Sequence, residues 1–315
     1  MKRALIRALT RLAERDDRVV VLTADLGFGI FDDFAARFGP RFVNVGVAEA
    51  QMLCMAAGLA LEGLRPVTYS IAAFHLGRAY EQIRLSVAYH GLPVTMVGVG
   101  GGYGYAESGV THHAVDDLAL MSGLPGMTVV AAGDPNETAA LAGQILDVAG
   151  PVYLRIGRGG EACYDAGDPP VIGRARRLRD GEGIAILTTG DVALVALEAA
   201  DALGQEGIRP AVWQMHTVKP LDTAALDRLA RSCDRFLVVE EHAPVGGLMS
   251  AVAAWRLARD AGPALTRLGP PDALALGNPL QAEIRRRFGY DAGAVVAACR
   301  ATWPRRALRA AGGGR

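Results

Sequence analysis

Short, continuous apolar runs alternate with longer stretches of helical period along the first half of the chain. The runs predict strands at residues 19–22, 42–45, 65–69, 94–98, 128–130 and 151–155. Helices are expected between them, at residues 2–15, 47–62, 77–90, 115–122 and from 136. Apolar strands separated by helices indicate a parallel sheet that is covered on both faces.

The second half repeats this kind of pattern after a break. Residues 159–182 are rich in Gly, Pro and charge and are expected to form a linker. Strands are then predicted at 184–188, 210–213, 236–240 and 264–268, and helices at 191–206, 223–231, 247–260 and 292–301. The predicted fold is therefore α/β with two domains, residues 1–158 and 183–304, each a mostly parallel sheet flanked by helices. The tail 305–315 is expected to be disordered.

The composition supports two globular domains and disfavours some classes of binding partner. The chain has 315 residues, of which 51% are hydrophobic, enough for two cores. Lys and Arg number 33, as do Asp and Glu, so the charge does not favour nucleic acid or an anionic membrane as the main partner. No apolar run reaches the roughly 18 residues that a membrane span requires.

The cysteines and the N-terminus suggest a cytoplasmic setting. Cys54, Cys163, Cys233 and Cys299 are far apart and include no Cys-x-x-Cys pair, so neither a zinc site nor a disulfide framework is expected. The N-terminal residues carry charges throughout and lack the pattern of a signal peptide.

Glu49 is the most informative residue, because it is a lone acid between an apolar strand and an Ala-rich helix. The helix, which contains Met52, Leu53, Met55 and Leu59, is apolar almost all round and is expected to be buried. The helix dipole stabilises a carboxylate at this position, whereas a low dielectric destabilises it. The alternative is an ordinary first-turn acid, which is a common feature of helices.

Two further segments could carry chemistry. The glycines of residues 98–104 follow a strand but do not form Gly-x-Gly-x-x-Gly, so they are expected to let the backbone pass close to a ligand or an adjacent subunit. His112 and His113 are adjacent and are expected to point to different sides, which disfavours joint metal binding. Either could be a general acid or base, or a hydrogen-bonded loop residue.

Seven segments occur in the order found in transketolases, and the resemblance covers about residues 1–300. They are Ala-Asp-Leu-Gly at 24–27, Asn-Val-Gly-Val-Ala-Glu at 44–49, Phe74 with Arg-Ala-Tyr-Glu-Gln-Ile-Arg at 78–84, Ser-Gly-Val-Thr-His-His at 108–113, Asp-Pro-Asn-Glu at 134–137, Met-His-Thr-Val-Lys-Pro-Leu-Asp at 215–222 and Glu-Glu-His-x-x-x-Gly-Gly-Leu at 240–248. The chain resembles the pyrimidine-binding and C-terminal domains of this thiamin-diphosphate family.

The resemblance implies roles for individual residues. The glutamate at the position of Glu49 hydrogen-bonds N1′ of the aminopyrimidine in this family and favours the tautomer that activates the thiazolium carbon. Phe74 is the first candidate for stacking on the pyrimidine, with Tyr80 the second, and Asp25 is expected nearby at the cofactor. His112 is similar to the histidine that faces the reactive oxygens of the substrate. The remaining expected substrate-binding residues are His113, Ser108 and Arg158, whose guanidinium suits a phosphate or carboxylate.

Departures from the family pattern bear on substrate and partner. Ser108 stands where sugar-phosphate transketolases have an aspartate, and Gly100 stands near the place of a phosphate-binding histidine, so the standard pentose-phosphate pair is not expected, or is held differently. The Gly-Asp-Gly motif and its following Asn, which hold a divalent metal against the diphosphate, are missing. A separate N-terminal subunit is therefore expected to supply the diphosphate site and Mg²⁺, with thiamin diphosphate shared across an α2β2 interface.

Three other functions stay open at this stage. The chain could be a subunit of a deoxyxylulose-phosphate-synthase-like enzyme, the β-subunit of a 2-oxo-acid dehydrogenase, or a non-catalytic partner subunit. The pair Thr111 and His112 favours the transketolase and synthase group over the dehydrogenases. Glu49 argues against the non-catalytic subunit, because a buried acid is costly to keep without a use.

Overall fold

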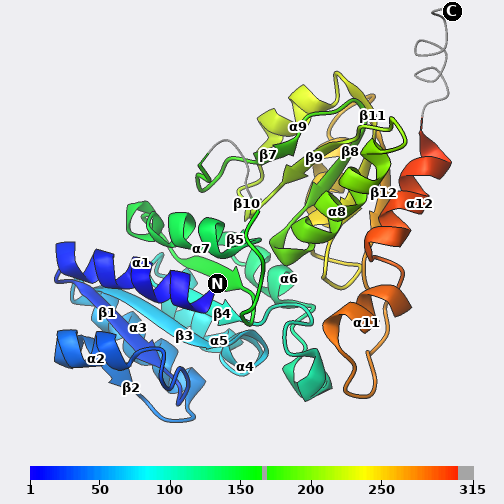
Figure 1. The fold of residues 1–315 in the computed structure, drawn as a ribbon. Coiled ribbons are helices and arrows are strands. Elements are labelled where there is room, and N and C mark those ends of the chain that lie inside the picture. Colours follow the sequence, from blue (N-terminus) through cyan, green and yellow to red (C-terminus); the bar gives the residue numbers. More distant parts are fainter. Residues whose placement is uncertain (165–168, 304–315) are drawn as a thin grey trace, which may run out of the picture.

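A computed structural model describes residues 1–164 and 169–303 and shows two sheets, each between layers of helices (Figure 1). The predicted tail at 305–315 lies outside the described residues. The α/β prediction with two mostly parallel sheets is confirmed. No helix in the described part is long and apolar enough to cross a membrane.

The first sheet has seven strands, of which only the edge strand β10 is antiparallel to its neighbour. In spatial order the strands are β10 (Thr217–Lys219), β5 (Thr128–Ala131), β6 (Val152–Ile156), β4 (Thr95–Val99), β3 (Arg65–Ile71), β1 (Val19–Thr23) and β2 (Phe42–Asn44). The helices of this half are α1 (Lys2–Arg15), α2 (Asp32–Phe38), α3 (Glu49–Leu61), α4 (Ala72–Gly77), α5 (Tyr80–Gln82), α6 (Asp117–Ser122) and α7 (Pro135–Ala142).

Strand β1 shows why this sheet is covered on both faces. Its side chains alternate between faces, as the pleat requires. Val20 and Leu22 belong to the core cluster with α3 and α6, whereas Val19 and Val21 belong to the cluster with α1, α2 and α7. The continuous apolar run therefore contributes side chains to two cores, one on each face of the sheet, as expected of a buried parallel strand.

The second sheet has five strands, and its edge strand β7 is antiparallel. In spatial order they are β12 (Ala264–Leu268), β11 (Cys233–Val239), β8 (Gly183–Thr188), β9 (Ala211–Gln214) and β7 (Arg176–Arg179). The helices of this half are α8 (Ala193–Gly204), α9 (Thr223–Leu229), α10 (Leu248–Leu257), α11 (Gln281–Arg287) and α12 (Ala292–Thr302).

Several elements differ from the sequence prediction. Within the segment expected as a linker, residues 176–179 form β7, and residues 217–219 of the second half form β10 in the first sheet. The helix predicted at 77–90 begins earlier, as α4, is interrupted after Gly77 and resumes as α5 and a π-helical turn at Ile83–Ala88. Helices α2 and α11 were not predicted. All of these elements are short, so their periodicity is weak.

The expectation that helix α3 is buried all round was wrong for this chain. Met52, Leu53 and Ala56 are buried, but Gln51, Cys54 and Gly58 are exposed, and Leu61 is 67% exposed. An apolar sequence cannot show whether a covering surface belongs to the same chain. One face of α3 therefore remains open in the single subunit.

The two halves meet at several backbone and side-chain contacts. The amide of Ala131 donates to the carbonyl of His216 at 2.7 Å, next to the β5–β10 pair. The amide of Ala119 donates to Nε2 of His242 at 3.2 Å, and Lys219 donates to the carbonyls of Ser122 and Leu124. These contacts fix the two sheets relative to each other. His216 and His242 are both fully buried.

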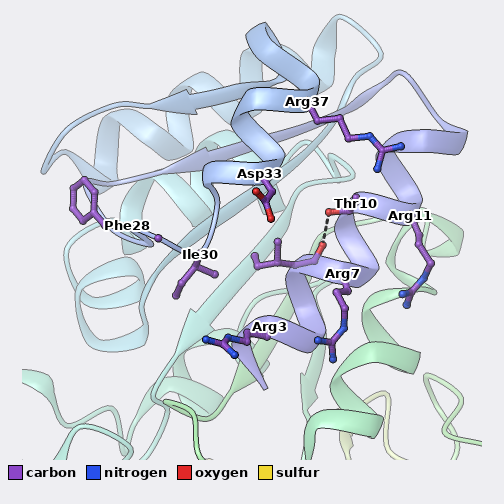
Figure 2. A pocket seen from close by; sticks show the side chains of 10 residues that line it. Arg3, Arg7, Thr10, Arg11, Phe28, Ile30, Asp33 and Arg37 are labelled. Atoms are coloured by element: carbon purple, nitrogen blue, oxygen red, sulfur yellow. Dashed lines mark hydrogen bonds between the residues drawn. The ribbon is translucent and has the colours of Figure 1, made fainter.

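Helix α1 carries a row of arginines beside a cavity of about 850 Å³ (Figure 2). Arg3, Arg7 and Arg11 repeat at four-residue spacing and are exposed, and the ion pairs of the described chain include none of them. Arg37 of α2, on the opposite wall, pairs with Glu14. Like charges at this spacing repel one another on a helix surface.

Arg7→Glu is expected to raise the free energy of unfolding by about 1 kcal/mol at low salt, because it converts repulsion by Arg3 and Arg11 into attraction. Urea unfolding at low and high ionic strength measures this, and the gain should shrink with salt. Arg7→Gln, which only removes the charge, should give a smaller gain. Equal or lower stability of the Arg7→Glu variant at low salt would contradict the repulsion.

His75 shows how burial sets a protonation state inside the first core. Its ring is fully buried between Oγ1 of Thr68, at 3.0 Å, and the carbonyl of Val97, at 3.1 Å. Burial lowers the pKa of His75 to about 4, although the hydrogen bond to Val97 opposes this. The folded protein therefore holds a neutral imidazole, and this contribution to stability is complete above the unfolded pKa of about 6.5.

Stability is expected to fall as the pH drops from about 6.5 to 4, by up to roughly 3 kcal/mol from His75 alone. The variant His75→Gln has no group to protonate, so its unfolding free energy should depend less on pH in this window, even if its stability at pH 7 is lower. Urea unfolding between pH 7 and pH 4 tests this. His90→Gln, at an exposed position, is the control and should keep the wild-type slope.

Candidate active site

The candidate site lies where parallel strands of the first sheet end. Strands β2, β1, β3 and β4 are neighbours in that order, so their C-terminal ends lie along one edge. In open α/β sheets, ligands bind at this edge. Asp25, Glu49, Phe74 and His112 all lie on segments that follow one of these strands.

Glu49 is the first residue of α3 and is only 4% exposed. Its Oε2 lies 3.4 Å from Nη1 of Arg78, a long contact to a half-exposed side chain. Its Oε1 accepts no hydrogen bond from the residues that the structure describes. A buried carboxylate normally has several partners, so Glu49 has room for one more.

Phe74 and Arg78 lie on one side of the same helical turn and connect Glu49 to residues 103–113, the segment that ends in His112 and His113 and is called the histidine loop below. The guanidinium of Arg78 stands 4.4 Å from the ring centre of Phe74, and that ring packs edge-on against His112, with 4.8 Å between the ring centres. Glu49, Phe74 and His112 thus belong to one continuous set of contacts. Arg78 was not predicted as a site residue from the sequence, although its i+4 spacing from Phe74 was a usable signal.

His112 is held in a short helical turn, Val110–His112, that follows Gly109. Gly109 has a φ of 78°, a conformation that other residues rarely adopt. Nδ1 of His112 lies 2.9 Å from Oγ1 of Thr111. Partial burial, and secondarily the neighbouring His113, lower the pKa of His112, so the imidazole is mostly neutral at pH 7.

His113 points to the other side, as the sequence analysis expected. Its Nε2 donates to the carbonyl of Ala106 at 3.3 Å, and its ring packs edge-on against Tyr103 at 4.8 Å. It does not share the contacts of His112 with Phe74. Its contacts are those of a hydrogen-bonded loop residue.

Arg158 lies by a second, more polar cavity of about 380 Å³ between the two halves, which it lines together with Glu107, Asp191 and Arg285. Nη1 of Arg158 pairs with Glu107 at 2.7 Å, and both side chains are about half exposed. Ser108, next in the chain, is exposed. Tyr105, which the sequence analysis did not anticipate, joins the cavity to the site: its ring lies 5.2 Å from the Arg158 guanidinium and 6.0 Å from the His112 ring.

The two other residues expected at the cofactor, Asp25 and Tyr80, lie in different parts of the first domain. Asp25, with a φ of 54°, is held by Asn44, whose Oδ1 accepts from the Asp25 amide at 3.0 Å. It therefore stands beside the segment that leads to Glu49. Tyr80 packs against the core that includes α3, and none of its described contacts joins it to His112. His75, the neighbour of Phe74, points into the core, so of these two adjacent side chains only Phe74 contacts His112.

The described residues contain no cluster of three or more His, Cys, Asp or Glu side chains able to hold a metal ion. The side chains that converge at the site instead combine an available carboxylate, an aromatic ring and a neutral imidazole. Such a set can bind a polar heteroaromatic ring and exchange protons with a bound substrate.

Comparison with known proteins identifies the family. The model of the transketolase pyrimidine-binding domain matches residues 1–160, and that of the transketolase C-terminal domain matches residues 173–295. The chain is 38% identical over 303 residues to the 6-deoxy-6-sulfo-D-fructose transketolase subunit SqwH of Clostridium sp. (strain MSTE9), which covers 96% of this chain and 94% of the relative.

Two further relatives show the extent of the similarity. The chain is 40% identical to the 1-deoxy-D-xylulose-5-phosphate synthase of Thermomicrobium roseum but spans only 46% of that protein. A solved split gene transketolase, described as an inactive beta4 tetramer, superposes with a TM-score of 0.86 at 35% identity and covers 96% of this chain and 97% of its own. The chain therefore belongs to the transketolase family, of which it carries the pyrimidine-binding and C-terminal domains.

Proposed function

We propose that the chain is a subunit of a thiamin-diphosphate-dependent transketolase, which transfers a two-carbon ketol unit from a ketose or ketose-phosphate donor to an aldehyde acceptor. The observation that carries this proposal is Glu49, a nearly buried acid with one oxygen unengaged among the described residues, beside the ring of Phe74. When bound, thiamin diphosphate supplies the nucleophilic carbon of the reaction. The chain's own part is to bind and orient the pyrimidine end and to control protons.

The residues present fit the pyrimidine. A carboxyl group can hydrogen-bond a ring nitrogen, and an aromatic ring can stack on a heteroaromatic one. The planar guanidinium of Arg78 already contacts both Glu49 and Phe74, so a flat, hydrogen-bonding group can reach the two together. The side chain of Arg78 is 54% exposed and its ion pair is long, so moving it aside costs little.

His112 and Arg158 suit the substrate. A neutral His112 can accept or donate a proton at a substrate oxygen through Nε2, while its Nδ1 is hydrogen-bonded to Oγ1 of Thr111. Arg158 can exchange its exposed pair with Glu107 for a charged group of the substrate, since such surface pairs contribute about 1 kcal/mol or less. The relative SqwH is named for a sulfonated sugar, which supports an anionic sugar as the substrate class here. Ser108 and His113 are also proposed for the substrate side; Ser108 is exposed, whereas His113 would have to leave its contacts with Ala106 and Tyr103.

A partner subunit is the second part of the proposal. Val47 and Val110, close before Glu49 and His112, are 71% and 43% exposed, as is typical of a surface that another subunit covers. The chain lacks the Gly-Asp-Gly motif, so we assign the diphosphate site and Mg²⁺ to an N-terminal subunit in an α2β2 assembly. The inactive beta4 state of the split relative supports this dependence. Four free thiols suit the cytoplasm as the location.

Mixing the chain with a diphosphate-binding subunit that carries the Gly-Asp-Gly motif, Mg²⁺ and thiamin diphosphate is expected to give ketol transfer. Mass spectrometry of the products from ketose-phosphate and sulfonated ketose donors, with an aldehyde acceptor, measures it. Each subunit alone should be inactive, because the cofactor site is divided. Robust activity of this chain alone would reject the divided site. Activity with pyruvate but not with ketoses would indicate a synthase of the deoxyxylulose-phosphate kind instead.

Glu49→Gln is expected to lower kcat of the reconstituted complex by at least about 100-fold, because an amide keeps the shape of the side chain but does not exchange the proton. Glu62→Gln, an exposed position at the end of the same helix, is the matched control and should retain full activity. Thermal unfolding of both variants checks that they fold. Wild-type turnover of the Glu49→Gln variant would favour a non-catalytic subunit.

A further inference from the structure

Glu241, at the end of β11 in the second domain, reaches into the first domain. Its side chain is 1% exposed, and four donors surround its carboxylate. Oε1 accepts from the backbone amide of Tyr103 at 2.9 Å and from Nε2 of Gln281 at 2.8 Å. Oε2 accepts from Nε of Arg285 at 2.8 Å and from the hydroxyl of Tyr290 at 3.2 Å. Of these donors, only Tyr103 belongs to the first domain.

The segment that Glu241 contacts is attached directly to the histidine loop. Gly102 and Ala114 exchange two backbone hydrogen bonds, both of 2.8 Å, on either side of the stretch that contains His112 and His113. The ring of Tyr103 packs on His113 at 4.8 Å. Any movement of the Tyr103 amide therefore displaces both ends of the histidine loop.

The glycines of this loop have a structural reason that supports the same connection. A Cβ on Gly102 would lie 2.7 Å from Oε1 of Glu241 and 2.5 Å from Nη2 of Arg155, and a Cβ on Gly101 would overlap the side chain of Arg155. Arg155 in turn joins Asp117 at 3.0 Å to the backbone carbonyl of Glu241 at 3.0 Å. The glycines thus let side chains, rather than a ligand, pass close to the backbone.

We propose that Glu241 is a positioning residue, which sets the place of His112 by holding the Tyr103 amide from the second domain. Its carboxylate is buried among protein donors, so its proposed effect on His112 is exerted through Tyr103. This inference rests on the proposed function only in that it gives His112 a part in catalysis. The second domain then has a role in the site of the first, in addition to any role in assembly.

Two variants of Glu241 separate the effect of its side-chain length from the effect of its charge. Glu241→Asp keeps the charge that pairs with Arg285 but is one methylene too short to hold the Tyr103 amide. Glu241→Gln keeps the side-chain length and an acceptor oxygen but removes one of the two carboxylates that pair with Arg285, leaving Asp191 at 2.8 Å. Loss of a buried charge partner is the more damaging change to stability. The Glu241→Gln variant should therefore be the less stable of the two, whereas the Glu241→Asp variant should displace the histidine loop more.

Ring ¹H–¹³C NMR spectra of the histidines in the isolated chain provide the direct readout. We expect the signals of His112 and His113 to shift more in Glu241→Asp than in Glu241→Gln, with urea unfolding ranking the stabilities in the opposite order. In the reconstituted complex, Glu241→Asp should lower kcat by about tenfold or more. The NMR result does not depend on enzyme activity, so it stands even if the proposed reaction is wrong.

Glu240→Gln is the matched control. Glu240 is adjacent, equally buried and paired with an arginine, Arg267, at 2.7 Å, but its contacts stay within the second domain. It should lose stability without shifting the His112 and His113 signals. Gln281→Leu, at a half-buried position, loosens Glu241 with less risk to folding and should shift those signals in the direction of Glu241→Asp. The proposal is overturned if Glu241→Asp and Glu240→Gln give the same histidine spectra. It is also overturned if the Glu241 variant with the larger shifts of the His112 and His113 signals is the one that loses more stability in urea.

Discussion

The arrangement of this molecule depends on a guanidinium that is buried at the contact between its two domains. Arg155 is 5% exposed and is held by Asp117, from helix α6 of its own domain, and by the main chain of Glu241 from the other domain. A buried charge is tolerated only when its partners are in place, and removal of one partner commonly costs several kcal/mol. Asp117 balances the charge from within the first domain, whereas the carbonyl of Glu241 completes the hydrogen bonding of Arg155 from the second domain. The second domain is thereby fixed against the edge of the first sheet.

That placement matters because the candidate site is built at the same edge. Parallel strands end side by side, so residues far apart in the chain, such as Glu49 and His112, come together there. The strands supply the rigid part, while the loops after them supply the chemistry. Residues 110–113 of the histidine loop are all at least partly exposed. Its anchorage to Glu241 through Tyr103 gives a loop segment the support of a buried network.

The open surfaces of the chain are consistent with a shared site. Leu61 of α3 is exposed, and Val47 and Val110 beside the site are exposed as well. Large apolar side chains so placed are stabilised when another surface covers them. A covering subunit would also exclude water from Glu49, which would strengthen every electrostatic interaction of its carboxylate. Assembly and site formation are thus parts of one event in the proposed complex.

Several features of the protein could be determined from the sequence alone. Continuous apolar runs predicted the two mostly parallel sheets, and ordered motifs indicated the family and the prominence of Glu49, because strand burial and motif spacing are local properties. Only the tertiary structure decided that Arg78 and Tyr105 join the site residues, that His75 points inward where Phe74 does not, and that β10 belongs to the first sheet. It also decided that Glu241 contacts the glycine loop. These are contacts between distant segments, which depend on how the two sheets are placed and leave no periodic trace in the chain.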